Sequence, residues 1–157
     1  MRYLLPMRAV IQRVSHAEVS VKERTTGSIG PGLLVFLGIE KLDTIEDRQW
    51  LAGKLPRIRC FEDEAGRMNQ DLHDIDGGIL VISQFTLYGS LRKGSRPSFN
   101  RAAEPEMARR FYESFLRELG SILEKDVACG VFGAEMKINA LNDGPVTLII
   151  DTRNRDF

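Results

Sequence analysis

Two short segments of the sequence carry residues that could do chemistry, and the first is Ser83-Gln84-Phe85-Thr86. Here hydroxyl and amide groups lie beside an aromatic ring, directly after a strongly apolar run at residues 78–82. Such an abrupt change at the end of a buried strand indicates the edge of a binding site. The same residues could instead satisfy backbone groups at the strand terminus, as serine and threonine side chains often do. The residues alone leave both interpretations open.

The second segment is residues 142–147, with the sequence NDGPVT. A turn that leads into a strand explains it fully, and this interpretation is favoured. Its chemical interest lies in Gly144-Pro145, because a glycine lets a ligand approach the peptide closely. An X-Pro bond can also be cis, which would aim carbonyl oxygens in one direction.

The common catalytic signatures are absent from the sequence. It has no nucleophile elbow, no phosphate-binding glycine loop and no zinc signature. A Ser-His-Asp triad could still assemble in space, but His16 and His73 offer few chances. Cys60 and Cys129 have neither metal-ligand spacing nor the number needed for a disulfide framework. We therefore expect reduced thiols in a cytoplasmic protein, with no metal and no cofactor.

The formal net charge is zero, from 22 basic and 22 acidic residues, so composition does not indicate a nucleic-acid-binding protein. The charges are unevenly distributed, however. No acidic residue occurs between positions 77 and 103, where Arg92, Lys93, Arg96 and Arg101 are all basic. This patch could hold phosphates, although a solvated loop also explains it.

Alternating and continuous apolar runs predict the strands. We expect them at residues 8–14, 17–21, 32–39, 78–88, 131–138 and 145–151. Turns are expected in the glycine-rich segment 27–32 and at residues 142–144, which would join the last two strands.

Two helices are predicted between these strands. The first begins at a capping box formed by Thr44 and Asp47, and Pro56 should end or bend it. Pro105 suits the first turn of the second helix. The apolar stripe of the first helix is Leu51, Leu55 and Ile58, and that of the second is Ala108, Phe111, Phe115, Leu119 and Ile122.

Strands at both ends with helices between them predict one α+β domain over residues 1–157, built on mostly antiparallel sheet. No apolar run approaches the length of a membrane span. There is no repeat and no linker.

The ordered segments together resemble a known family. RMNQDL, SQFTLYG, KGSRPSF and NDGPVTLIID follow MRAVIQRVSHAEVSV and GSIGPGLLVFLGIE in the order found in D-aminoacyl-tRNA deacylases. The resemblance covers residues 7–151. It implies a barrel-like sheet with about two helices, and a homodimer with active sites at the subunit interface.

The resemblance also assigns expected roles to individual residues. Ser83, Gln84, Phe85 and Thr86 match the catalytic segment, which forms the floor of the pocket for the terminal adenosine and its ester. Two further expectations concern substrate binding. Gly144 and Pro145 match a Gly-cis-Pro motif that enters the partner subunit's active site, and Arg13 matches the arginine that helps to hold this motif. Residues 96–99 match a stretch near the pocket with no specific role.

The implied reaction is hydrolysis of the ester of D-aminoacyl-tRNA, and of glycyl-tRNA, with L-aminoacyl substrates rejected through the Gly-cis-Pro motif. The 2′-hydroxyl of the tRNA would assist the attacking water, so no triad is needed. Two alternatives remain: an esterase that uses Thr86 or Ser83 as a covalent nucleophile, and a non-catalytic RNA-binding module.

Overall fold

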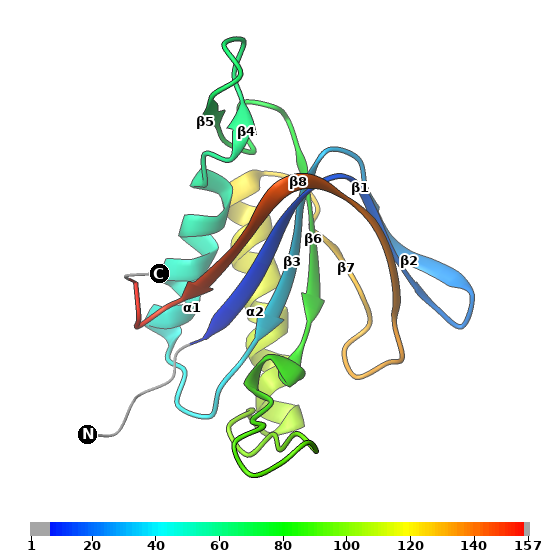
Figure 1. Ribbon diagram of the computed structural model, residues 1–157, viewed down its shortest axis with the longest axis vertical. Coiled ribbons are helices and arrows are strands. Elements are labelled where there is room, and N and C mark those ends of the chain that lie inside the picture. The colour runs from blue at the N-terminus through cyan, green and yellow to red at the C-terminus, as the bar shows by residue number, and fades with distance from the viewer. Residues whose placement is uncertain (1–6, 156–157) are drawn as a thin grey trace.

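The long strand β1 (Arg8–Val21) organises the sheet in the computed structural model, which describes residues 7–155 (Figure 1). Along one edge β1 pairs antiparallel with β8 (Lys137–Asp151) over nearly its whole length. Along the other it pairs antiparallel with β3 (Gly32–Gly38) and then with β2 (Arg24–Ile29). The two strands predicted at residues 8–14 and 17–21 are therefore one strand, which continues through register shifts opposite β8.

The apolar strands β3 and β6 (Gly78–Ser83) pair in parallel, and β6 pairs in parallel with the short β7 (Ala128–Cys129). Near-continuous apolar sequence is typical of parallel strands that are covered on both faces. At the far edge, β2 approaches β7 so closely that a Cβ added to Gly27 would lie 2.7 Å from the carbonyl oxygen of Cys129. The sheet is thus nearly closed into a barrel. A small hairpin of β4 (Phe61–Glu62) and β5 (Met68–Gln70) lies apart from it.

Two helices cover one face of this sheet, α1 (Ile45–Lys54) and α2 (Pro105–Leu123) (Figure 1). The predicted capping box of α1 is confirmed, and Pro56 lies in a short 3-10 turn, η1 (Leu55–Arg57), that follows it. The apolar stripe of α2 is buried except at Ile122, which is 49% exposed and so lies outside the core. No helix in residues 7–155 is long and apolar enough to cross a bilayer.

The α+β class, the barrel-like sheet and the two helices are confirmed, with a sheet that is mixed because β3, β6 and β7 run parallel. Four local predictions were wrong. The strand expected at residues 131–138 is irregular up to residue 136, and only its last two residues belong to a strand, β8. The expected turn segment 27–32 includes part of β2, and the strand expected at residues 78–88 ends at Ser83, where a 3-10 helix, η2 (Phe85–Tyr88), follows. The turn expected at residues 142–144 lies inside the continuous strand β8, because a register shift opposite β1 absorbs these residues without reversing the chain.

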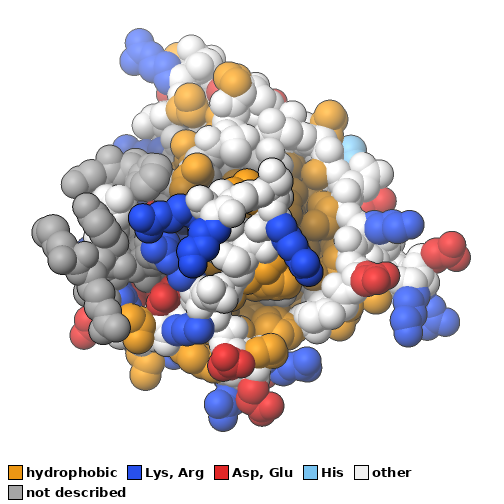
Figure 2. Space-filling model, turned by 60° about the horizontal axis from the view of Figure 1, so that its bottom comes forward, with side chains coloured by type: hydrophobic (Ala, Val, Ile, Leu, Met, Phe, Trp, Pro, Cys, Tyr) orange, Lys and Arg blue, Asp and Glu red, His pale blue; other side chains and the backbone are white. Residues whose placement is uncertain are grey.

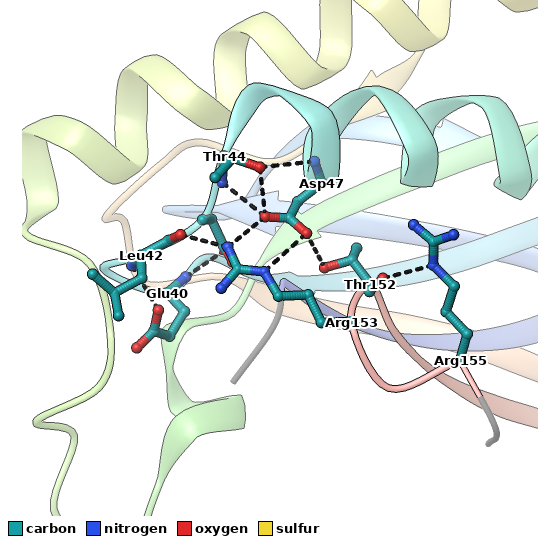
Figure 3. A network of polar contacts seen from close by, with 8 residues as sticks. Glu40, Leu42, Thr44, Asp47, Thr152, Arg153 and Arg155 are labelled. Atoms are coloured by element: carbon teal, nitrogen blue, oxygen red, sulfur yellow. Dashed lines mark hydrogen bonds and ion pairs between the residues drawn. The ribbon is translucent and has the colours of Figure 1, made fainter. Parts of the chain in front are cut away.

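The chain that follows β8 is fixed to the start of α1 by Asp47 (Figure 3). Its carboxylate accepts hydrogen bonds from Thr44, from the Thr152 hydroxyl at 2.9 Å and from the Arg153 guanidinium at 2.6 Å. Burial alone would raise the pKa of Asp47, but these hydrogen bonds together hold it at about 2. The Arg153 guanidinium also donates to the Leu42 carbonyl, so the segment before α1 is tied to the same network.

Next to this network, Asp43 makes stability depend on pH. Burial is the main reason that its pKa rises from 3.8 to about 7, and Asp47 and Glu40 act in the same direction. Its Oδ1 atom has no hydrogen-bond partner among the described residues. The folded chain therefore keeps a proton that the unfolded chain releases, and the free energy of unfolding falls as pH rises from about 4 to about 7.

We expect Asp43→Asn to remove most of this fall, which amounts to a few kcal/mol. Urea unfolding at pH 5 and pH 8 measures it. An equal loss of stability between these pH values in the variant and the parent would show that Asp43 is not responsible.

Candidate active site

A cavity of about 400 Å³ opens at the end of β6. Ser83, Gln84 and Phe85 form one side of it. The rest of the lining comes from β3 and the residue after it, from the start of α2 and the residues before it, from the segment before β8 and from β8 itself: Leu37, Ile39, Ala102, Ala103, Pro105, Ala108, Phe132, Gly133, Ala134, Met136 and Ile138, with Ile82 of β6. Figure 2 shows a hollow lined by hydrophobic side chains, with Lys and Arg side chains beside it.

None of the residues that line this cavity, within the part of the chain that the structure describes, has a side chain that titrates near neutral pH. Residues 7–155 therefore place no side-chain general base in the lining of the cavity. What it supplies is an apolar space with a hydroxyl and an amide at one edge. Such a site can hold and orient a substrate more readily than it can move a proton.

The polar edge owes its geometry to the end of the β3–β6 ladder. The backbone N–H of Gln84 still donates to the Leu37 carbonyl at 2.8 Å, and the chain then turns into η2. The N–H groups of Phe85 and Thr86 begin this helix, so neither has a carbonyl partner within it. Two backbone donors therefore lie beside the cavity.

Thr86 lies next to the cavity but does not line it. Its exposed hydroxyl accepts a hydrogen bond from the side-chain amide of Gln84. His16 and His73 are also exposed, and neither lines the cavity. The structure thus brings Ser83, Gln84 and Phe85 together at the cavity and leaves Thr86 beside it without a basic partner among the described residues.

An aromatic pair lies at the mouth of the cavity. The ring of Phe85 is 58% exposed and contacts Phe99 edge-on, with 5.1 Å between the ring centroids. The loop that carries Phe99 is closed by two hydrogen bonds between Ser90 and Ser98. Residues 96–99, for which the resemblance implied no specific role, therefore include a ring that supports Phe85 at the cavity mouth.

Two residues that were not predicted from the sequence anchor η2 to the neighbouring strands. The Tyr88 hydroxyl donates to the Gly38 carbonyl at 3.0 Å, and burial raises the pKa of this phenol well above its usual range. Arg8 pairs with Asp151 at 2.8 Å and donates to the Leu87 carbonyl. Only the contacts between distant strands reveal these roles, because nothing in the local sequence marks either residue.

The second predicted segment lies elsewhere on the chain. Gly144 and Pro145 are exposed, and the peptide bond between them is cis. Arg13 is buried beneath them: its Nε donates to the Asp143 carbonyl at 3.0 Å and its Nη1 to the Cys60 carbonyl at 2.7 Å. Arg13 thus fixes the backbone immediately before Gly144.

Gly144 does not line the cavity of its own chain. Ile138 of the same strand does, and Gly144 lies six residues further along β8. At about 3.3 Å per strand residue, six residues span at most roughly 20 Å, and none of residues 139–145 lines the cavity. The structure therefore does not bring the two predicted segments together within one subunit.

One cluster of possible metal ligands occurs among the described residues. Atoms of Asp71, His73 and Asp74 lie within 4.8 Å of one another in the turn after β5. Asp71 and Asp74 each accept the backbone N–H of the other, so the turn itself accounts for their arrangement. None of the three lines the cavity.

Comparison with known proteins decides the family. The model of a family described as D-Tyr-tRNA(Tyr) deacylase matches residues 10–151. A D-aminoacyl-tRNA deacylase of Opitutus terrae is 54% identical over 150 residues, which are 96% of this chain and 100% of the relative. One of Akkermansia muciniphila is 52% identical with the same coverage. The chain belongs to the D-Tyr-tRNA(Tyr) deacylase family. This match confirms the resemblance inferred from the motifs. Because deacylases are hydrolases, the chain is a hydrolase.

Two solved structures share the fold of this member of the deacylase family. The c-Myc DNA unwinding element binding protein is 39% identical with a TM-score of 0.86, over 92% of this chain and 98% of that one. A probable eukaryotic D-amino acid tRNA deacylase has a TM-score of 0.82 over 94% of this chain and 100% of its own. At 17% identity, the second shows the fold alone.

Proposed function

We propose that the chain hydrolyses the ester bond between a D-amino acid and the 3′-terminal adenosine of tRNA. Membership of the deacylase family supports this reaction. The observation that carries the proposal is the cavity at the end of β6, whose polar edge is formed by the motif residues Ser83, Gln84 and Phe85. The apolar lining suits a nucleoside and leaves the ester beside the backbone donors of η2.

The described residues that line the cavity include no titratable side chain, which supports a reaction in which the substrate provides the catalytic group. The tRNA 2′-hydroxyl is adjacent to the ester and would assist the attacking water. Holding the reacting groups together can supply a large part of the reduction in barrier. The N–H groups of Phe85 and Thr86 would stabilise the developing oxyanion at distances of about 3 Å.

Incubation of the purified protein with D-tyrosyl-tRNA tests the proposal. We expect release of tyrosine much faster than spontaneous hydrolysis. Tight binding of the tRNA without release would instead favour the non-catalytic RNA-binding module.

Exposed side chains on β8 support a homodimer in which the subunits complete each other's sites. Among the described strands, β8 pairs with β1 alone, and it presents Leu141, Leu148 and Ile149, which are 55%, 38% and 46% exposed. A long apolar edge strand needs a cover, and a twofold dimer supplies one. Such a dimer could bring the exposed Gly144–Pro145 of one subunit to the cavity of the other. A fully active monomer at micromolar concentration in light scattering would contradict this.

Within this dimer, we assign the choice between D- and L-amino acids to the backbone at Gly144 and Pro145. With the α-ammonium and the ester both held, the two remaining positions on the α-carbon are distinguishable. A D side chain would point to solvent, whereas an L side chain would collide with the backbone. Backbone cannot move aside by changing rotamer, so the wrong substrate is rejected by a clash. Glycine has only hydrogen there and should be accepted.

The covalent alternative makes a different prediction for Thr86. A threonine nucleophile needs a base to activate it, and the Thr86 hydroxyl contacts only the Gln84 amide among the described residues. We expect Thr86→Ala to retain deacylase activity within about tenfold of the parent. Loss of a group that takes part in proton transfer would lower the rate more, by about 100-fold or more. A loss of several orders of magnitude, with fold and tRNA binding intact, would restore the covalent mechanism. Trapping of an acyl-enzyme would do the same.

A further inference from the structure

The loop beside the cavity carries unpaired positive charge. Arg92, Lys93 and Arg96 are exposed, and none of them forms an ion pair with a described residue. The whole stretch from position 77 to 103 contains no acidic residue. We call these three residues the basic rim.

The basic rim belongs to a loop that is fixed to the site at several points. Two hydrogen bonds between Ser90 and Ser98, of 2.8 and 3.0 Å, close the loop. Phe99 packs against Phe85 at the cavity mouth, and the Arg101 carbonyl accepts the Lys41 N–H at 3.3 Å. The three cations are therefore held next to the cavity mouth, and Figure 2 shows basic side chains gathered beside the hollow.

The lining of the cavity differs from the basic rim in its charge and polarity. The described residues that line the cavity are mostly apolar and include no cation, so it suits a base or sugar better than a phosphate. A polynucleotide whose last nucleoside lies in the cavity must carry its phosphodiester chain out through the mouth. Cations at the mouth would meet that chain, and exposed Lys and Arg side chains bind phosphates by releasing counterions.

We propose that the basic rim binds the phosphodiester backbone at the 3′ end of the tRNA, while the cavity holds its terminal nucleoside. This inference rests on the proposed function, because it takes the aminoacyl ester as the group held in the cavity. The rim would add affinity for the polynucleotide and take no part in ester hydrolysis.

The experiment compares two substrates and two variants. One substrate is D-tyrosyl-tRNA; the other is adenosine carrying a D-tyrosyl ester, which has the nucleoside and the ester but no phosphate. The rim variant is Arg92→Gln, Lys93→Gln and Arg96→Gln. The matched control removes three exposed cations from the helical side of the molecule, by Lys54→Gln, Arg57→Gln and Arg117→Gln.

For D-tyrosyl-tRNA at low salt we expect the rim variant to lose about tenfold or more in kcat/KM, mainly through KM. The slope of log kcat/KM against log salt should become shallower by about 2, since each contact to a single strand contributes roughly 0.7. Hydrolysis of the adenosine ester should be unchanged. The control variant should match the parent on both substrates.

Equal kcat/KM and equal salt slopes for the rim variant and the parent on D-tyrosyl-tRNA would overturn the inference. So would an equal loss on both substrates, which would mean that the loop shapes the cavity. If the parent hydrolyses neither substrate, the proposed function itself fails. Because one structural relative is described as a DNA-binding protein, duplex DNA is included as a competitor. Inhibition by DNA that depends on the rim, with tRNA hydrolysis unaffected by the rim substitutions, would assign the loop to DNA instead.

Discussion

Replacing Gly144 with alanine is expected to leave the fold intact and to lower deacylation of D-tyrosyl-tRNA by about 100-fold, the cost of a misplacement of about 1 Å in a reacting complex. Among the described residues other than its two chain neighbours, the nearest atom to a Cβ built at this position is Asn142 Oδ1 at 3.6 Å, which is ordinary contact. The subunit therefore has room for the methyl group. If Gly144 lies against the substrate in the partner's cavity, the methyl group occupies space that the substrate needs.

The matched control for this substitution is Gly30→Ala. Gly30 lies between β2 and β3, and an added Cβ there has no heavy atom of a described residue within 4 Å apart from those of its two chain neighbours. Both variants should keep the parent's thermal midpoint and its oligomeric state, and only Gly144→Ala should lose activity. Full activity of Gly144→Ala would remove this residue from the substrate site.

Mixing two inactive variants is expected to restore activity. The first is Gly144→Ala, which keeps its own cavity and presents an altered motif to its partner. The second is Ala134→Trp: Ala134 is a half-buried cavity residue in the segment before β8, so an indole there fills the cavity. In a mixed dimer, the normal cavity of the first subunit faces the normal Gly144 of the second.

Random exchange of subunits makes half of the dimers mixed, each with one intact site, so activity should recover to about one quarter of the parent value. The measurement is deacylation after the two proteins are unfolded and refolded together, with mixed dimers counted by two different affinity tags. Mixed dimers that form but remain inactive would show that Gly144 does not act on the partner's cavity.

Motifs with local physical causes could be predicted from the sequence. Thr44 and Asp47 form their capping box because both partners lie within one turn of chain. The Ser83–Phe85 edge of the cavity follows directly from the end of an apolar strand. These predictions needed no knowledge of distant contacts.

Features that depend on distant contacts could not be predicted in the same way. Gly144 and Pro145 suggested a turn, yet β1 pairs with β8 on both sides of them and keeps the strand continuous. The far wall of the cavity comes from the segment that contains Phe132 and Met136, whose apolar residues resembled a strand. Arg8 supports η2 through a carbonyl 79 positions away in the chain.

The central claim is that the chain removes D-amino acids from tRNA and rejects L-amino acids. Its most direct test is the rate of deacylation of D-tyrosyl-, glycyl- and L-tyrosyl-tRNA at one enzyme concentration, each corrected for spontaneous hydrolysis. We expect the D-tyrosyl and glycyl esters to be cleaved rapidly and the L-tyrosyl ester to remain near its spontaneous rate. Cleavage of L-tyrosyl-tRNA at a rate comparable to that of the D-form would contradict the account.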